Sequence, residues 1–432
     1  MSRIFFFILI SSFLVSCSLN DNSKIWNKKN QNTQKNKNIK VILTKKNNYQ
    51  TELNPNIKLN LSNIKYKNNI NDLKNNFGSS DYSGFFNKIN DFKFSKFKDI
   101  EKLNFKPLFL NDGFVFFDKK GSIFRYDENK KILWKKNYYK KAEKKISPKL
   151  NFAISGNNLI VADNIAKIYS LDVTSGDLLW SKSNKYPLNS EIKIFKENFF
   201  VVDYKNTLRC FNVIDGSECW NVPTENSLTI SGSKYSIIIS NDLVIFNNSI
   251  GDITAVDIAT GLINWQLPTQ SSNIINESYS FTNSQLVADE NSLYFSNNKN
   301  EFYSVDLKRG IIRWTNKINS TLTPILVDDL IFTVSEDGFL MIIQKKQGNI
   351  LRTTDVYKNY KNKHRKKIKP VGFSIGQNKL YLSNTDGKMI LVELDTGKPL
   401  KLMKISGGKI SKPFIHNKNL FIIKNGSVIK YD

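Results

Sequence analysis

The chain has 432 residues and a formal net charge of +26, which comes from 64 Lys and Arg against 38 Asp and Glu. Hydrophobic residues make up 40% of it, an ample supply for a folded core. The positive charge is scattered, with no basic helix or recognisable nucleic-acid-binding module, which argues against nucleic acid as a partner. The charge fits either solvated faces rich in Lys and Asn, or attraction to anionic lipid or an acidic partner.

The first residues have the features of an export signal. Arg3 precedes an apolar run, 4–14, that is too short to span a membrane as a mature helix. The following Leu14-Val15-Ser16-Cys17 resembles the lipobox of bacterial lipoproteins, in which the Cys is acylated and becomes the new N-terminus. We therefore predict that residues 1–16 are a lipoprotein signal peptide and that Cys17 carries the lipid; the alternative is an ordinary signal peptide with a chance Cys.

Residues 17–87 lack the pattern of the rest of the chain. They are rich in Asn and Lys, which predicts a lipidated N-terminus followed by a flexible, solvated tether. Ser18 follows the lipidation site, and by resemblance to enteric lipoproteins this residue implies sorting to the outer membrane. Residues 57–66 alternate between apolar and polar types, as a short strand does, but the sequence gives this strand no place.

From residue 88 onward one hairpin pattern repeats. In Gly251–Trp265 an alternating strand leads through the turn 257–261 into a return strand that ends in Trp. The Trp position recurs at a spacing of roughly 38 to 49 residues, and an eighth copy stops at Asp432. This period predicts an all-β fold, an eight-bladed β-propeller with four antiparallel strands per blade, over residues 88–432. Five blades have the tryptophan that we expect to dock on the next blade: Trp134, Trp180, Trp220, Trp265 and Trp314.

Two features set the end of the repeat apart. The eighth copy is one strand short, so we predict that residues 88–98 complete the last blade from the N-terminal side; the alternative is a lead-in loop. Arg352 and Lys401 occupy the Trp position in blades six and seven. We therefore expect docking to be absent there and these two blades to be looser.

The sequence offers few residues for catalysis or metal binding. His364 and His416 are the only histidines, and neither belongs to a cluster with metal-ligand spacing. Cys210 and Cys219 flank one hairpin turn, and a disulfide between them is permitted in an exported protein, but cross-strand geometry is often poor for one. The Asp residues that recur at equivalent positions of the hairpin turns indicate a structural role rather than a catalytic one. We predict no catalytic residues, no metal and no cofactor.

One long connection, 357–367, carries a cluster of Lys, Arg and His. It fits either a solvated loop or a contact with a membrane or a partner.

The pattern Asp-x-x-Thr/Ser-Gly-x-x-x-Trp, as in Asp257–Trp265, resembles the tryptophan-docking repeat of pyrroloquinoline quinone (PQQ)-type eight-bladed propellers. One family with this repeat is the quinoprotein dehydrogenases, which carry a vicinal Cys pair and a calcium site in the central channel. This chain has no Cys-Cys pair. The other is the BamB family of outer-membrane assembly lipoproteins, which the chain resembles in lipobox, tether, length, blade number and lack of enzyme residues.

Resemblance to the BamB family implies a non-enzymatic scaffold, lipid-anchored at the periplasmic face of the outer membrane. It implies docking on the periplasmic POTRA repeats of a BamA-like barrel insertase, with unfolded outer-membrane proteins as further candidate partners. The family's contact loop after blade three falls on Leu228 and Ile230, with Ser231 in place of its Arg. The family's acidic pair falls near Ser280 and Thr282, which are not acidic. Leu228 and Ile230 alternatively belong to the first strand of blade four, and the alternative function is a PQQ-dependent dehydrogenase.

Overall fold

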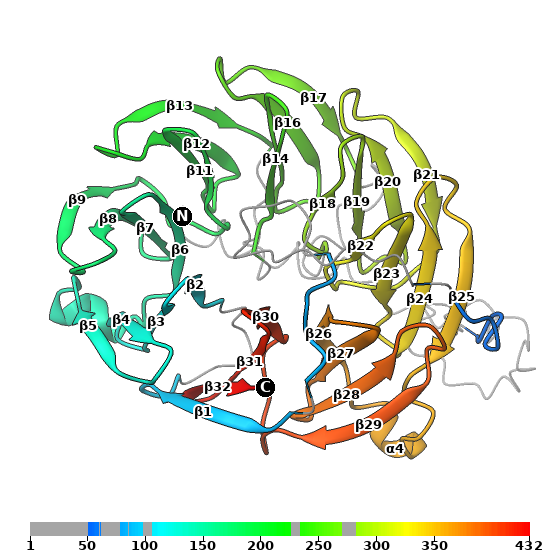
Figure 1. The fold of residues 1–432 in the computed structure, drawn as a ribbon. Helices are drawn as coiled ribbons and strands as arrows, with labels where there is room; N and C mark the ends of the chain where they lie inside the picture. Colours follow the sequence, from blue (N-terminus) through cyan, green and yellow to red (C-terminus); the bar gives the residue numbers. More distant parts are fainter. Residues whose placement is uncertain are drawn as a thin grey trace, which may run out of the picture. The chain divides into compact units, whose positions relative to one another are not determined.

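The structure is a computed structural model that describes residues 51–59, 61, 78–84, 86–97, 106–225, 234–269 and 282–432. Each sequence repeat folds as a four-stranded antiparallel sheet, and eight such sheets stand in a ring (Figure 1). The predicted eight-bladed β-propeller is therefore confirmed. No helix among these residues has the length and apolar character needed to cross a membrane.

The first four blades have their strands in sequence order, from the centre of the ring outward. Their strands are β2 (Leu108–Leu110), β3 (Gly113–Phe117), β4 (Ile123–Asp127) and β5 (Ile132–Lys136); β6 (Leu150–Ser155), β7 (Asn158–Asp163), β8 (Lys167–Asp172) and β9 (Leu178–Ser183); β10 (Lys193–Phe195), β11 (Asn198–Val202), β12 (Thr207–Asn212) and β13 (Glu218–Pro223); β14 (Ile237–Ser240), β15 (Leu243–Asn247), β16 (Ile253–Asp257) and β17 (Ile263–Leu267).

Blades five to seven repeat this order, and blade eight takes its outermost strand from the N-terminal side. Their strands are β18 (Val287–Ala288), β19 (Ser292–Ser296), β20 (Phe302–Asp306) and β21 (Ile312–Asn316); β22 (Ile325–Val327), β23 (Leu330–Val334), β24 (Phe339–Gln344) and β25 (Ile350–Asp355); β26 (Pro370–Ile375), β27 (Lys379–Asn384), β28 (Lys388–Glu393) and β29 (Pro399–Lys404); β30 (Phe414–His416), β31 (Asn419–Lys424), β32 (Ser427–Tyr431) and β1 (Lys88–Lys93). Two short helices lie in connections, α3 (Lys141–Lys145) and α4 (Asn362–Arg365).

The ring closes through the pairing of β1 with β32, as predicted, although the strand ends at Lys93. Beside this pair the C-terminal residue, Asp432, is held by the chain that precedes β1. The hydroxyl of Tyr82 donates to the carbonyl of Asp432 at 2.9 Å, and the amide of Asp432 donates to Asn87 at 3.1 Å. A Cβ on Gly84 would lie 2.3 Å from Asp432, so only glycine permits this close approach.

The hairpin turns follow the chemistry expected from the sequence. In the turn after β16, the Asp257 carboxylate accepts bonds from the Thr260 amide (2.8 Å) and hydroxyl (2.7 Å). Gly261 has φ +73°, a conformation that glycine adopts without steric cost. These hydrogen bonds hold the pKa of the Asp257 carboxyl below its usual value. The returning strand then begins with a β-bulge, and pairing resumes at Trp265 opposite Ala255.

The two cysteines of blade three are both free. In the register of β12 and β13, Cys210 pairs with Trp220 and Phe211 pairs with Glu218, so Cys219 sits in the bulge between these pairs. Cys210 is buried and Cys219 is exposed.

Parts of the segment before the first blade lie against the propeller. Leu53 and Thr353 of β25 exchange two backbone hydrogen bonds, of 3.0 and 3.1 Å, and the amide of Leu59 donates to Asp395 at 3.0 Å. We call residues 51–59 the strap. It extends the edge of blade six and reaches the turn of blade seven, a position that the alternating pattern of 57–66 did not reveal.

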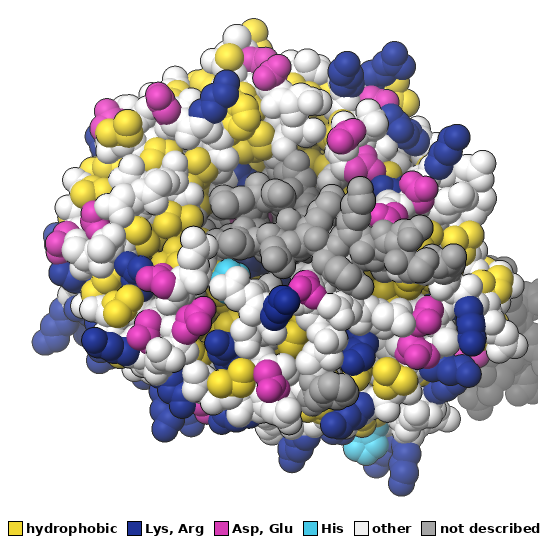
Figure 2. Space-filling model, viewed as in Figure 1, with side chains coloured by type: hydrophobic (Ala, Val, Ile, Leu, Met, Phe, Trp, Pro, Cys, Tyr) yellow, Lys and Arg dark blue, Asp and Glu magenta, His cyan; other side chains and the backbone are white. Residues whose placement is uncertain are grey.

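The surface is mixed in charge. On the face seen in Figure 2, Lys and Arg side chains stand around the margin of the disc with Asp and Glu between them. This distribution follows from lysines that are spread over every repeat rather than concentrated in one segment.

Candidate functional site: the blade contacts and the central channel

The structure describes only some of the predicted site residues. The lipidation residue Cys17 and the predicted partner contacts Leu228 and Ile230 lie outside the described residues. Thr282 lies at the channel, where its amide donates to the Asn298 side chain at 3.1 Å. The five predicted docking tryptophans are all described.

Each of these tryptophans joins its blade to the next. The indole N–H donates to a backbone carbonyl at the start of the next blade's hairpin turn, at 2.9 to 3.0 Å. The pairs are Trp134 with Val173, Trp180 with Val213, Trp220 with Ile258, Trp265 with Leu307, and Trp314 with Lys345. The ring also covers the turn glycine: a Cβ on Gly310 would lie 2.6 Å from Trp265. One side chain thus both packs and donates across each of these five interfaces.

Arg352 takes the tryptophan's place between blades six and seven. The side chain is fully buried, and its guanidinium donates to the carbonyls of Leu394 at 2.7 Å, Asp395, and Ile57 of the strap at 2.9 Å. Burial lowers its pKa to about 10, so the group is still protonated at neutral pH. The expectation that docking is absent at Arg352 is therefore wrong, because a planar guanidinium donates to several carbonyls at once.

Lys401 differs from Arg352. It is exposed, and the following blade has no hairpin turn between its third and fourth strands, because its fourth strand, β1, comes from the N-terminal side. Aromatic side chains occupy this interface instead. Tyr82 and Phe86, from the chain before β1, have ring centroids 5.2 and 5.4 Å from that of Tyr381 in blade seven.

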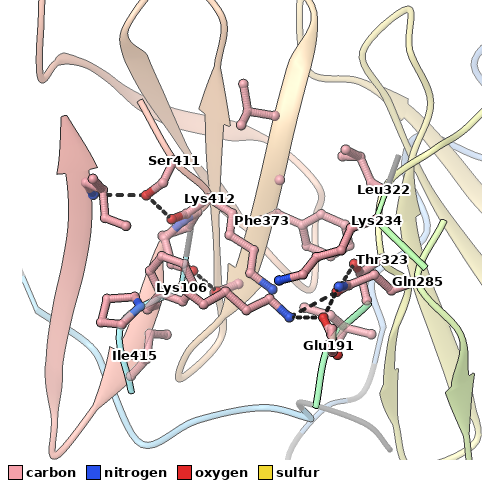
Figure 3. Close-up of a pocket in the computed structure, with 18 of the residues that line it drawn as sticks. Lys106, Glu191, Lys234, Gln285, Leu322, Thr323, Phe373, Ser411, Lys412 and Ile415 are labelled. Atoms are coloured by element: carbon pink, nitrogen blue, oxygen red, sulfur yellow. Dashed lines mark hydrogen bonds and ion pairs between the residues drawn. The ribbon is translucent and has the colours of Figure 1, made fainter. Parts of the chain in front are cut away.

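The central channel contains a cavity of about 380 Å³, lined by residues at or near the innermost strands. Figure 3 shows polar side chains from four blades that meet there. Lys106 of blade one forms an ion pair with Glu191 of blade three, and Gln285 of blade five donates to the same carboxylate. Thr323 of blade six donates to Gln285 at 3.0 Å. This network links blades across the channel and satisfies a buried carboxylate.

The channel lining is rich in cations. Lys234, Lys409 and Lys412 also line it, whereas Glu191 supplies the only carboxylate among the described lining residues. A calcium ion needs six or more oxygen ligands, commonly with several carboxylates, and the described residues contain no cluster of three His, Cys, Asp or Glu side chains. The described residues of the channel therefore do not supply the ligands of the calcium site of the quinoprotein dehydrogenases.

Sequence reasoning missed both the channel network and the strap. Lys106, Glu191, Gln285 and Thr323 each lie two residues before the first strand of their blade. This shared position in the repeat is the signal that could have found them, because ring closure brings equivalent positions together around the channel. Arg352 departs from the repeat at the tryptophan position, and this departure was the available signal of a buried hydrogen-bonding role.

The family model and the related sequences that match this chain all point to the same family. The family model described as "Outer membrane protein assembly factor BamB" matches residues 119–354. A protein of that name from Moranella endobia (strain PCIT) is 21% identical over 277 residues, which cover 63% of this chain and 69% of the relative. Another from Francisella salina is 26% identical over 169 residues, which cover 34% of this chain and 31% of that relative.

Solved structures share the fold. The crystal structure of BamB from Moraxella catarrhalis has a TM-score of 0.63 at 15% identity, covering 80% of this chain and 99% of that one. A europium-containing methanol dehydrogenase has a TM-score of 0.56 at 10% identity, covering 74% and 82%. At these identities the structural similarity establishes the propeller fold but does not establish a function.

Proposed function

Because this chain belongs to the BamB family of outer membrane protein assembly factors, we propose that it is a non-enzymatic, lipid-anchored scaffold of the outer-membrane β-barrel assembly machinery. The match of the family model to residues 119–354, more than half of the chain, is the observation that carries this proposal. In the proposed mechanism the disc docks on the POTRA repeats of a BamA-like insertase and orients those repeats or incoming clients. The partner is bound without any covalent step.

The form of the propeller supports a scaffold. Six buried or partly buried Trp and Arg side chains join blades one to seven in sequence, and β1 closes the ring. A closed ring has little freedom to deform, so a partner bound at one loop is held in a fixed orientation to the others. The channel network further links blades one, three, five and six.

The proposed contact, Leu228 and Ile230, lies in the connection between blades three and four. The described start of this connection is hydrogen-bonded: the buried side-chain amide of Asn206 donates to the carbonyl of Glu225 at 2.8 Å. The same amide donates to the hydroxyl of Ser249 in blade four, also at 2.8 Å. These bonds fix where the connection leaves blade three and so where the proposed contact can reach.

The proposed lipid on Cys17 would keep the disc near the membrane. From Cys17 to the start of the strap at residue 51 the chain can extend at most about 115 Å. Tethering over such a length raises the effective concentration of the disc near a membrane-embedded partner without any new contact.

A crosslinked pull-down of the lipidated protein from its own outer membrane tests the proposal. We expect to recover a large barrel protein with periplasmic repeats, and to lose it with the double change Leu228→Asp and Ile230→Asp. The matched control makes the same change at two exposed residues of β29, Leu400 and Leu402. Normal recovery with the folded contact variant would refute the contact, and a bound quinone in the absorbance spectrum without any barrel protein would favour the dehydrogenase alternative.

A further inference from the structure

A second cavity, of about 590 Å³, lies between the α4 connection and blade seven, and we call it the basic groove. Its lining includes five lysines: Lys367, Lys369, Lys388, Lys404 and Lys409. One carboxylate, that of Asp386, is in the same lining. Helix α4 and strands β28 and β29 lie together at the lower right of the ring in Figure 1.

The charges of the groove are only partly compensated. Lys388 pairs with Asp386 at 3.2 Å, and Lys369 pairs with Glu336 at 3.3 Å. The ammonium groups of Lys367 and Lys404 form no ion pair within the part of the chain that the structure describes. Lys367 and Lys404 therefore add positive charge to one concave surface. Such a surface attracts and concentrates anions.

The connection that carries these lysines is fixed to the propeller. Ile368 is buried in the core of blades six and seven, and the amide of Ile368 donates to the carbonyl of His364 at 3.2 Å. Arg365 of α4 forms an ion pair with Asp355 of β25 at 2.5 Å. The lysines on either side are thus presented from an ordered support rather than from a free loop.

The strap reaches the propeller at the same place. The Glu52 carboxylate accepts a hydrogen bond from the amide of Asp355 at 3.2 Å, and the side chain of Asp355 is the partner of Arg365. The described part of the strap therefore begins beside α4, at the edge of blade six.

We propose that the basic groove binds the phosphate groups of anionic phospholipid headgroups, so that blades six and seven form the membrane-facing sector of the disc. Lysines suit this role because each is a flexible point charge that can follow mobile phosphates without a fixed bidentate geometry. Lysines near an anionic membrane surface each strengthen binding several-fold. This inference goes beyond the proposed function and does not require the insertase, so either can fail alone.

Vesicle co-sedimentation of the full chain with the change Cys17→Ser, which removes the acylated residue, tests the proposal. One set of vesicles is phosphatidylcholine, and in the other about a third is phosphatidylglycerol. The apolar run 4–14 contributes equally to both sets, so the difference between them reports charge. We expect preference for the anionic vesicles, and the double change Lys367→Gln and Lys404→Gln to lower that partition roughly 25-fold, about fivefold per lysine.

The matched control is Lys182→Gln and Lys185→Gln, two exposed lysines that follow Trp180 in blade two. This control removes the same charge and should change the partition by less than about threefold. An equal loss with both pairs would overturn the proposal, since binding would then follow net charge alone. Absence of preference for anionic vesicles would also overturn it. Release of the vesicles by inorganic phosphate at constant ionic strength would assign the groove to a soluble phosphate instead.

Discussion

Alanine at Gly310 tests how strongly a tryptophan joins two blades. Gly310 has φ +69°, and a Cβ there would lie 2.6 Å from the ring of Trp265. The left-handed backbone costs an alanine about 1 kcal/mol. Displacing a packed ring costs about 1–3 kcal/mol more. We therefore expect Gly310→Ala to lower the free energy of unfolding by about 2–4 kcal/mol.

Gly156 provides the matched control. It also has a positive φ, +55°, but no atom lies within 4 Å of the position that its Cβ would occupy. Gly156→Ala therefore meets the backbone cost alone, about 1 kcal/mol. The difference between the two variants isolates the contact between the turn and the tryptophan.

Urea unfolding followed by circular dichroism measures this difference, because a shift of midpoint at constant slope reports stability directly. Equal midpoints for Gly310→Ala and Gly156→Ala would refute the reasoning, since they would show that the ring moves aside at no cost. A slope that changes in one variant alone would show that the blades no longer unfold together.

Three further predictions concern single side chains. Trp265→Ala should lower the free energy of unfolding by about 3–5 kcal/mol in the same urea assay, because the side chain is buried. Arg352→Met removes the donors to the strap, so residues 51–59 should become sensitive to limited proteolysis, read by mass spectrometry. The hydrogen bond from Arg313 holds the pKa of Asp306 below its ordinary value of 3.8. The stabilisation from Asp306 is thus complete above that value and lost as pH falls through the lowered pKa, so Asp306→Asn should flatten the fall in melting temperature on acidification below about pH 4.

Each of these predictions has an outcome that contradicts it. A loss below about 1 kcal/mol for Trp265→Ala would mean that the cavity collapses freely. Lys401→Met, at the exposed equivalent position, is the control for Arg352→Met. Equal protease sensitivity in both variants would show that the guanidinium does not hold the strap in place. An unchanged acid limb in Asp306→Asn would assign the acid sensitivity to other carboxyls.

Local pattern predicted most of the fold. The turn at Asp257–Gly261 is closed by bonds between residues a few positions apart, so its sequence is sufficient to specify it. Repetition of that turn indicated the blade number, and the prediction that residues before the first blade complete the eighth is confirmed by the pairing of β1 with β32. Tryptophan docking also follows from the repeat, because each blade presents the same turn to its neighbour.

The candidate site was harder to predict. Resemblance to the BamB family supplied Leu228 and Ile230, which lie outside the described residues. The basic cluster 357–367 pointed to one side of the basic groove, but not to the blade-seven lysines that complete it. Lys404 and Lys367, for example, come from different elements and share a groove only after blade seven has packed against the α4 connection.

The sequence by itself thus determined the blade, the number of blades and the way in which one blade follows another, since these depend on hydrogen bonds and packing between near neighbours in the chain. Only the tertiary structure decided that Arg352 docks on the next blade as a tryptophan does, that Glu191 is shared across the channel, and that the strap lies along β25. These contacts join residues far apart in the chain. They form once the ring has closed, and nothing in the local pattern of either partner encodes them.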